Sequence, residues 1–383
     1  MAELKSRSAK AGEVIFRFGD NADCAYIVES GEVAIIMGLD DQNSDLAIVS
    51  KGELLGEMGI IDNAKRAATA IARTNCVLTI VDKEQLHARL ATADPVIQLI
   101  LTVILDRVRS LLHPTHVKTN AALQNIGMDF IKLENELKAG LEENELKLFL
   151  QPIADTKTKK IAGFEALIRW NHPKRGLISP DLFIKLAEDS GIILEIGRWI
   201  LLEACTLAQR LENNKNNAGV YKKGAFISIN VSTPQFKDPN FIRTLKEVLE
   251  ETKIPPHRVK LEITESCLSD AEAAKNWIYR VKALGVRISL DDFGTGYSSL
   301  SYLHEYELDT IKIDQSFIKK MLSNERSLHI VDFIMKLADK LCLDIIAEGI
   351  ESQVQFDKLK ELGCHYIQGY IISKPKPIDE YFT

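Results

Sequence analysis

Short strand-like segments occupy the N-terminal part of the chain. Between Glu13 and Val81, hydrophobic runs such as EVIFRF, AYIVESGEVAIIM and ATAIARTNCVLTIV are separated by turn-forming residues, and no helical period persists over the length of a helix. Several short strands with turn signals between them are typical of a sandwich or barrel. Residues 1–94 are therefore predicted to form a small all-β domain, a β-roll.

A helical pattern replaces the strands after Lys83. The segment DPVIQLILTVILDRVRSLL carries apolar residues at helical spacing behind Asp94 and Pro95, a combination that marks a helix start. Helical spacing resumes between Asn120 and Asn144. Residues 95–144 are predicted to form a helical connector. Because a long amphipathic helix often packs against its own copy, we expect a homodimer.

The remaining residues, 145–383, alternate between strand-like and helical patterns. Eight strand-like runs are separated by amphipathic segments, many of which are closed by glycine. This alternation predicts an α/β fold, a TIM-like (β/α)8 barrel, for which about 250 residues are typical. The first two runs are joined only by ADTKTKK, which indicates a hairpin, so we expect one antiparallel strand and a modified barrel. The eight runs are LKLFLQPI, IAGFEALIRW, AFISINVS, VKLEITES, VRISLDD, TIKIDQS, LDIIAEGI and YIQGYII.

Composition and charge narrow the class of protein. The 383 residues include 46% hydrophobic and 27% charged residues, as in a folded soluble protein of two or three domains. A net charge of −6 argues against direct binding of duplex nucleic acid. Six scattered cysteines without ligand-like spacing are expected to be reduced thiols. The N-terminus has no apolar signal region, and the run from Val96 to Leu105 is too short to span a bilayer. We expect a cytoplasmic protein with no membrane partner.

Polar side chains stand at the predicted C-terminal end of every barrel strand, where barrel enzymes carry their chemistry. A single acid at a strand end is most often a helix cap or a solvated charge. Here five carboxylates face one lysine and one arginine, and protonation could neutralise only some of them. Hard divalent cations such as Mg²⁺ or Mn²⁺ prefer oxygen ligands and would neutralise them all. In strand order the set is Gln151, Glu165 with Arg169, Asn230, Glu262, Asp291 with Asp292, Lys312, Glu348 and Gln368.

The segment LDDFGTGYSSL places two adjacent carboxylates, Asp291 and Asp292, at the end of a strand. Neighbouring side chains in a regular strand point to opposite faces, so both can serve one site only where the backbone turns away. Gly294 and Gly296 are expected to supply that freedom. The pair could share a proton or bind a metal. The surrounding acids favour the metal, with Asp291 bridging two ions and Asp292 completing the second.

These segments resemble the motifs of the EAL-domain cyclic di-GMP phosphodiesterases. QPI, EALIRW, INVS, LEITES, DDFGTGYSSL, IKID, AEGIE and QGY occur in the family's order over about residues 131–383, with no departure at a position the family uses. The resemblance implies that two Mg²⁺ or Mn²⁺ ions are held by Glu165, Asn230, Glu262, Asp291, Asp292 and Glu348. It also implies a water-orienting Lys312, a phosphate contact at Arg169, substrate-lining Gln151, Leu167 and Gln368, and a glutamate, Glu265, that holds the DDFGTGYSSL loop, which the family links to dimerisation.

The chemistry of such a site agrees with the resemblance. Two divalent ions would activate water at neutral pH and stabilise the attacking and leaving oxygens of an in-line displacement at phosphorus, giving linear pGpG from cyclic di-GMP. Glu165, Lys312 and Glu348 would be the catalytic side chains, with Lys312 positioning the water or helping to deprotonate it. The signature of the partner cyclases, GGDEF, is absent from the chain, so synthesis of the dinucleotide is not expected.

A second ligand site is expected in the β domain. GELLGEMGIIDNAKRAATAIA resembles the phosphate-binding cassette of cyclic-nucleotide-binding domains, in which a glycine-opened helix and an arginine bind the phosphate and a glutamate accepts from the ribose hydroxyl. The resemblance favours cAMP over cGMP, because Ala67 stands where a hydroxyl residue would favour cGMP. The implied site residues are Gly56, Glu57, Met58, Arg66, Ala67 and Ala68.

Several functions remain open from the sequence. The first is a cyclic di-GMP phosphodiesterase that cAMP regulates, by activation in our expectation. The second is a catalytically weak cyclic di-GMP receptor, which predicts lost metal ligands. The barrel alone would also suit an aldolase or enolase-like enzyme, whose strand-end lysine forms a Schiff base or abstracts a proton. The β-roll, in turn, could have kept its shape and lost its nucleotide.

Overall fold

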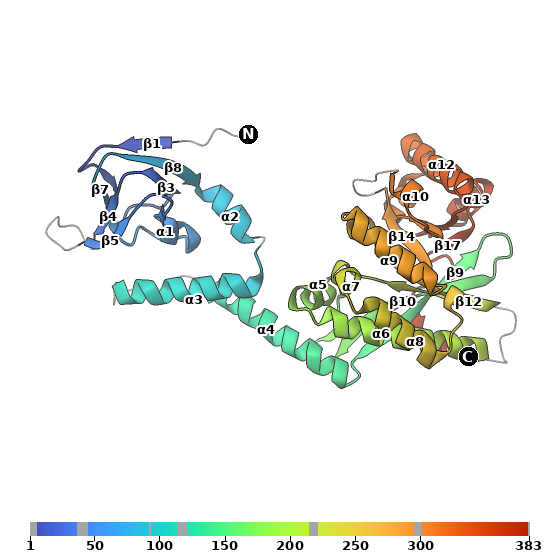
Figure 1. Cartoon of the computed structure of the whole chain (residues 1–383). Helices are drawn as coiled ribbons and strands as arrows, with labels where there is room; N and C mark the ends of the chain where they lie inside the picture. The colour runs from blue at the N-terminus through green and yellow to red at the C-terminus, as the bar shows by residue number, and fades with distance from the viewer. Residues whose placement is uncertain are drawn as a thin grey trace. The chain divides into compact units, whose positions relative to one another are not determined.

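The computed structural model describes residues 6–36, 45–91, 93–112, 121–213, 221–294 and 301–381 (Figure 1). The chain divides into two compact units, residues 1–135 and 136–383. The division falls inside the second connector helix. None of the described helices is long and apolar enough to cross a membrane.

The N-terminal unit is built on two antiparallel sheets of four strands each, which confirms the predicted all-β domain. Val28, Val33, Leu55, Ala70 and Leu78 belong to its buried core. The first sheet has the order β1 (Ser6–Ala9), β8 (Cys76–Asp82), β3 (Cys24–Ser30), β6 (Leu54–Leu55), and the second the order β2 (Val14–Phe16), β7 (Thr69–Ala72), β4 (Val33–Ile36), β5 (Asp45–Val49). Two short helices, α1 (Glu57–Ile61) and α2 (Lys83–Ala91), accompany these sheets.

The connector is helical, as its spacing predicts. Helix α3 (Pro95–Leu112) begins where Asp94 accepts the backbone N–H groups of Val96 and Ile97 at 2.8 and 3.2 Å. Helix α4 (Ala121–Glu142) follows, and residues 113–120 lie outside the described part of the chain.

The C-terminal unit is an eight-stranded barrel with one antiparallel strand. Strands β10 and β12–β17 pair in parallel in chain order, and β9 closes the barrel by pairing antiparallel with both β17 and β10. The short turn between β9 and β10 leaves no room for a crossover helix, which explains the antiparallel strand and confirms the predicted hairpin. The barrel strands are β9 (Leu146–Asp155), β10 (Ile161–His172), β12 (Tyr221–Asn230), β13 (Val259–Thr264), β14 (Arg287–Phe293), β15 (Thr310–Ile313), β16 (Asp344–Ala347) and β17 (Tyr366–Gln368).

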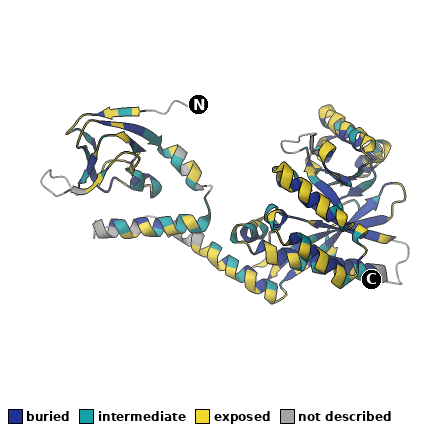
Figure 2. Ribbon diagram, in the orientation of Figure 1, coloured by how far each residue is buried: buried dark blue, intermediate teal, exposed yellow. Residues whose placement is uncertain are grey.

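Helices cover the outside of the barrel with buried apolar faces and exposed polar ones (Figure 2). Side-chain caps fix several starts: Asp270, Asn324 and Ser352 each accept a backbone N–H in the first turn. The helices are α5 (Pro180–Ser190), α6 (Ile193–Asn213), α7 (Thr233–Lys237), α8 (Phe241–Thr252), α9 (Ala271–Ala283), α10 (Ser301–Glu305), α11 (Gln315–Lys320), α12 (Glu325–Lys340) and α13 (Gln353–Glu361). Strands β11 (Gly176–Ile178) and β18 (Lys376–Pro377) and the 3-10 turns η1 (Pro256–Arg258), η2 (Glu265–Leu268) and η3 (Ile378–Tyr381) complete the unit.

The close approach of β10 and β12 depends on a glycine. A Cβ at Gly163 would lie 2.5 Å from two ring carbons of Phe226, its partner on β12. We predict that Gly163→Ala lowers the free energy of unfolding by about 1–3 kcal/mol, because the ring must leave its position. Denaturant titration measures the change. Phe226→Leu in the same chain should recover part of the loss, and a Gly163→Ala protein as stable as wild type would contradict the tight packing.

Candidate active site and nucleotide cavity

Polar side chains from all eight barrel strands meet at one end of the barrel. The sheet register places Glu165 opposite Gln151 and Asn230 opposite Glu262. Hydrogen bonds and ion pairs then join the strands across the interior. The group that the structure brings together consists of Gln151, Glu165, Asn230, Glu262, Asp291, Lys312, Glu348 and Gln368, and we call it the mouth group.

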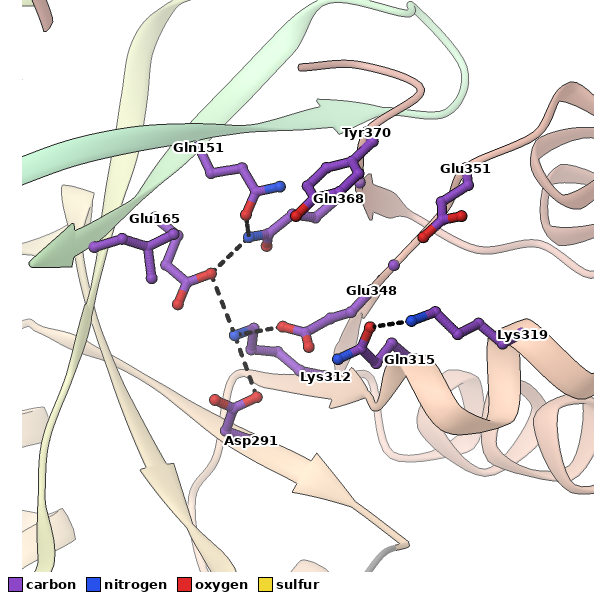
Figure 3. Close-up of a pocket in the computed structure, with 13 residues that line it drawn as sticks. Gln151, Glu165, Asp291, Lys312, Gln315, Lys319, Glu348, Glu351, Gln368 and Tyr370 are labelled. Carbon is purple, nitrogen blue, oxygen red and sulfur yellow. Dashed lines mark hydrogen bonds and ion pairs between the residues drawn. The ribbon is translucent and has the colours of Figure 1, made fainter. Parts of the chain in front are cut away.

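The ammonium group of Lys312 lies at the centre of the mouth group (Figure 3). Its side chain is buried, and no other charged side chain in the described part of the barrel contacts so many acids. The distances from Nζ are 2.6 Å to Glu348 Oε1, 2.7 Å to Glu262 Oε2, 3.2 Å to Asp291 Oδ1 and 3.8 Å to Glu165 Oε2. A buried charge is stabilised only when it is paired, so the lysine and the acids depend on each other.

Asp291 and Asp292 point to one site because the strand is interrupted between them. The pairing of β14 with β15 shifts register between Leu290 and Phe293, as in a β-bulge, and Asp292 itself has φ 52°. Gly294, with φ 95°, has a left-handed backbone as expected, but the turn that joins the two carboxylates occurs two residues earlier, at Asp292. Gly296 and the rest of the predicted loop, residues 295–300, lie outside the described residues.

Two amide side chains hold Glu165. Gln368 Nε2 donates to Glu165 Oε2 at 2.6 Å and to Gln151 Oε1 at 2.9 Å, and Asn230 Nδ2 donates to Glu165 Oε1 at 2.8 Å. Burial raises the pKa of Glu165, but the attraction of Lys312 and the two amide donors outweigh burial and leave this pKa below its usual value. Glu165 is therefore an ionised carboxylate whose orientation is fixed by two amide side chains.

Glu262, Glu348 and Asp292 have raised pKa values because burial dominates. Burial, partly opposed by Lys312, raises the pKa of Glu262 to about 8 and that of Glu348 to about 7. Burial and then the nearby Asp291 raise the pKa of Asp292. The pKa of Lys312 is raised well above its usual value, since its carboxylate neighbours outweigh burial. The site thus holds more negative charge than one lysine compensates.

The mouth group opens into a cavity of about 290 Å³. Seven predicted residues line it, and the sequence analysis missed four polar residues that also line it: Gln315, Lys319, Glu351 and Tyr370 (Figure 3). Gln315, Glu351 and Tyr370 follow a predicted strand-end residue within three positions, which is the signal that could have found them, whereas Lys319 lies seven positions after Lys312. The predicted residues in the lining are Gln151, Glu165, Leu167, Asp291, Lys312, Glu348 and Gln368.

Two further predicted residues, Arg169 and Glu265, are not among the described residues that line the cavity. Arg169 donates from Nη1 to the carbonyl of Ile168 and lies 5.8 Å from the ring centre of Phe149, so its phosphate contact stays a prediction. Glu265 Oε1 accepts the N–H of Gly294 at 3.3 Å, which places it at the start of the loop that it is predicted to hold.

The donor set fits hard divalent cations. Asp291, Asp292 and Glu348 can each place one oxygen so that all three lie within 4.8 Å of one another. Glu262 Oε1 is buried and has no hydrogen-bond partner among the described residues. Oxygen donors with surplus negative charge suit Mg²⁺ or Mn²⁺. Glu165, Asn230 and Glu262 could complete a second position if Lys312 gave up part of its ion pairs.

A second cavity, of about 130 Å³, lies in the N-terminal unit. Its lining includes all six residues predicted for the nucleotide site: Gly56, Glu57, Met58, Arg66, Ala67 and Ala68. Phe16, Ile35, Val49 and Leu54 add an apolar wall. The cavity therefore combines a charged end with an apolar body, as a cyclic nucleotide requires.

Arg66 is held by backbone carbonyls at the charged end of this cavity. Nη1 donates to Gly56 O at 2.6 Å and Nη2 to Cys24 O at 2.5 Å, while the guanidinium lies 4.2 Å from the ring centre of Phe16. The buried Nε has no hydrogen-bond partner among the described residues. Gly56 begins α1 with φ 78°, and a Cβ there would lie 2.4 Å from Arg66 Nη1. An arginine held in this way can pair with a phosphate at the start of α1.

Comparison with protein families identifies both parts of the chain. The model of the EAL domain matches residues 121–375, and that of the cyclic nucleotide-binding domain matches residues 6–93. A solved structure of the EAL enzyme Bd1971 with bound cAMP and cyclic di-GMP is 37% identical, with a TM-score of 0.76, and the match covers 99% of each chain.

Other relatives match only the barrel part of this chain. MucR of Pseudomonas aeruginosa, a bifunctional diguanylate cyclase/cyclic di-GMP phosphodiesterase, is 37% identical over 251 residues, which are 65% of this chain and 36% of MucR. A solved complex of PaMucR phosphodiesterase with c-di-GMP is 37% identical, with a TM-score of 0.61, and covers 65% of this chain and 99% of its own. The chain spans about a third of the length of the first curated relatives it matches.

The paired aspartates provide a test of the metal site. We predict that Asp292→Asn weakens Mn²⁺ binding at least about tenfold, because one ligand charge is lost while asparagine still tolerates the left-handed backbone. Isothermal titration calorimetry of the metal-free protein measures the affinity. The melting temperature of the metal-free variant should not fall, since the repulsion from Asp291 disappears. Unchanged Mn²⁺ affinity would remove Asp292 from the ligand set.

Proposed function

The chain belongs to the EAL domain family, and we propose that it is a phosphodiesterase that hydrolyses cyclic di-GMP to linear pGpG with two Mg²⁺ or Mn²⁺ ions. The observation that carries the proposal is the complete mouth group, assembled around one cavity that a nucleotide can enter. Bd1971 and PaMucR, each solved with cyclic di-GMP, supply the substrate class by analogy.

The side chains in and near the mouth group have different proposed roles. The ions, when bound, would activate water and stabilise the attacking and leaving oxygens at phosphorus. Glu165, fixed by Gln368 and Asn230, and Asp291, Asp292, Glu262 and Glu348 would hold them. Lys312, with its strongly raised pKa, would donate hydrogen bonds to the attacking water and orient it, but would not take its proton. Arg169 would pair with a phosphate oxygen of the substrate.

The competing functions suit this arrangement less well. A nucleotide receptor without catalysis predicts missing metal ligands, whereas all six predicted ligand residues are present. An aldolase or enolase-like reaction needs a neutral lysine amine, and the four carboxylates around Lys312 keep it protonated. The geometry therefore favours phosphodiester hydrolysis.

We further infer that cAMP binds the N-terminal cavity and activates the barrel. Ala67, which offers no hydroxyl beside Arg66, favours cAMP over cGMP, although solved forms of Bd1971 hold either nucleotide. Support for coupling comes from Asp62, the residue that ends α1, which forms a buried bidentate ion pair with Arg109 of α3. Nucleotide binding at the start of α1 can therefore act on the connector through this pair.

The far end of the connector is joined to the strand that carries Glu165. Glu136 of α4 lies 3.4 Å from His172 Nε2 and 3.0 Å from Arg175 Nε. A Cβ at Gly140 would lie 3.0 Å from the indole nitrogen of Trp170 on β10. A displacement of α4 would thus be felt by β10, five residues from its metal ligand. These contacts support a regulatory role for α4.

Catalysis is tested most simply at Glu165. We predict that Glu165→Ala reduces hydrolysis of cyclic di-GMP at least about a hundredfold, because it removes a metal ligand at the mouth and leaves the hydrophobic core intact. Chromatographic assay of pGpG at saturating Mg²⁺ measures the rate. Glu247→Ala, a matched change on the exposed face of α8, is the control and should retain full activity. Near-normal turnover of Glu165→Ala would refute the assignment.

Regulation is tested by separating nucleotide binding from its transmission. Arg66→Ala should weaken cAMP binding at least about tenfold and abolish the response, because the phosphate loses its charged partner. The double variant Asp62→Asn/Arg109→Gln, which leaves no buried charge unpaired, should still bind cAMP and lose most of the activation. Calorimetry measures binding and the pGpG assay measures activation. A wild type that does not respond to cAMP, or a double variant that responds fully, would contradict the coupling.

A further inference from the structure

The arginine of the N-terminal cavity lies against an aromatic ring. The guanidinium of Arg66 is 4.2 Å from the ring centre of Phe16, the last residue of β2, and both side chains line the cavity. A Cβ at Gly56 would lie 3.1 Å from Phe16 Cε1, so the ring also reaches the start of α1. Phe16 therefore contacts both groups that are proposed to receive the phosphate.

The backbone of Arg66 is joined to the turn that follows Phe16. Gly19 donates its N–H to the carbonyl of Arg66 at 3.0 Å, and Arg66 donates its own N–H to the carbonyl of Asp20 at 2.9 Å. These two hydrogen bonds fix Arg66 beside the end of β2. The contact between the ring and the guanidinium is therefore set by main-chain pairing as well as by side-chain packing.

Tyr26 holds the ring of Phe16 in place. The two rings are stacked, with centres 6.3 Å apart and an angle of 16° between their planes. Tyr26 is buried in the core of the unit, on the strand β3 whose Cys24 carbonyl accepts a hydrogen bond from Arg66. A ring packed against a close-packed core has little freedom to move, so Phe16 can act as a fixed support.

Hydrogen bonds hold only one edge of the Arg66 guanidinium. This planar group has five N–H donors, and the carbonyls of Gly56 and Cys24 accept from its two Nη atoms. A planar group that is held along one edge can still turn about that edge. A ring against its face opposes this rotation and also attracts the cation. Nε, which is buried without a hydrogen-bond partner among the described residues, then stays available for a phosphate oxygen.

We propose that Phe16 is a positioning residue of the nucleotide site, which holds the guanidinium of Arg66 in its phosphate-binding orientation before the nucleotide binds. The proposal rests on the nucleotide site of the proposed function. An arginine that occupies this orientation only part of the time binds more weakly, because the nucleotide must then restore the orientation. Loss of the ring should weaken cAMP binding about fivefold, the scale of a partly buried cation–π contact.

Two simpler roles would also place Phe16 here. The ring packs against the buried core of the unit, so it could serve stability alone. It also lines the cavity, so it could contact the nucleotide directly. Neither role acts through Arg66. The effect of Phe16 on affinity should therefore depend on Arg66 only if Phe16 positions the arginine.

The test measures cAMP affinity of the full-length protein by isothermal titration calorimetry. Phe16→Leu removes the ring and keeps an apolar side chain. It should raise the dissociation constant about fivefold when Arg66 is present, and less than about twofold in the Arg66→Ala variant. Val49→Ala shortens another side chain of the same cavity and is the matched control, whose effect should be the same with and without Arg66.

A second substitution keeps the size and place of the ring. A trifluorinated phenylalanine at position 16 has nearly the same shape as phenylalanine, but the negative potential of its face is weaker. We expect this replacement to raise the dissociation constant for cAMP at least about threefold. Circular dichroism without nucleotide verifies that the fold is retained.

The outcomes separate this proposal from the proposed function. An equal loss of affinity for Phe16→Leu with and without Arg66 would overturn the positioning role, since the ring would then act by direct contact. Wild-type affinity of the folded trifluorinated protein would also overturn it, because attraction by the ring face would not be the cause. A wild type that binds no cAMP would contradict the nucleotide site and, with it, this proposal.

Discussion

One ammonium group organises the end of the barrel on which the function depends. Lys312 contacts carboxylates from four other strands, and a buried acid without such a partner would take up a proton or destabilise the fold. The barrel can bring these acids together only because Lys312 on β15 places a positive charge among them. The amide contacts of Glu165 and the bulge at Asp292 complete the arrangement.

Either Lys312 or bound divalent cations can neutralise these acids, and the proposed chemistry depends on the replacement of the first by the second. Lysine compensates part of their charge, and the raised pKa values of Glu262 and Glu348 report the remainder. Divalent cations would compensate it fully and release Lys312 to orient water. A movement of β10, which carries Glu165, or of β14, which carries Asp291, would change how far Lys312 and bound cations each neutralise the acids. In the N-terminal unit, Asp62 at the end of α1 pairs with Arg109 of α3, and in the proposed regulation cAMP would act on the connector through this pair.

Features that follow from local sequence patterns were predictable, and features that depend on several strands were not. The eight apolar runs predicted the eight barrel strands, and the short ADTKTKK segment predicted the antiparallel pairing of β9. The left-handed backbone of Asp292 was not foreseen, because glycines nearby offered an easier turn. Gln315 and Lys319 reach the cavity from α11, beyond the strand ends.

The central claim is that the mouth group binds two divalent cations in place of part of the Lys312 ion pairs. Anomalous diffraction from crystals of the full chain grown with Mn²⁺ tests it most directly. The account predicts two anomalous peaks, roughly 3.5–4 Å apart, in contact with Asp291, Asp292 and Glu348 and with at least one of Glu165 and Glu262. An absence of peaks at the mouth, with Lys312 still paired to all four acids at saturating Mn²⁺, would contradict it.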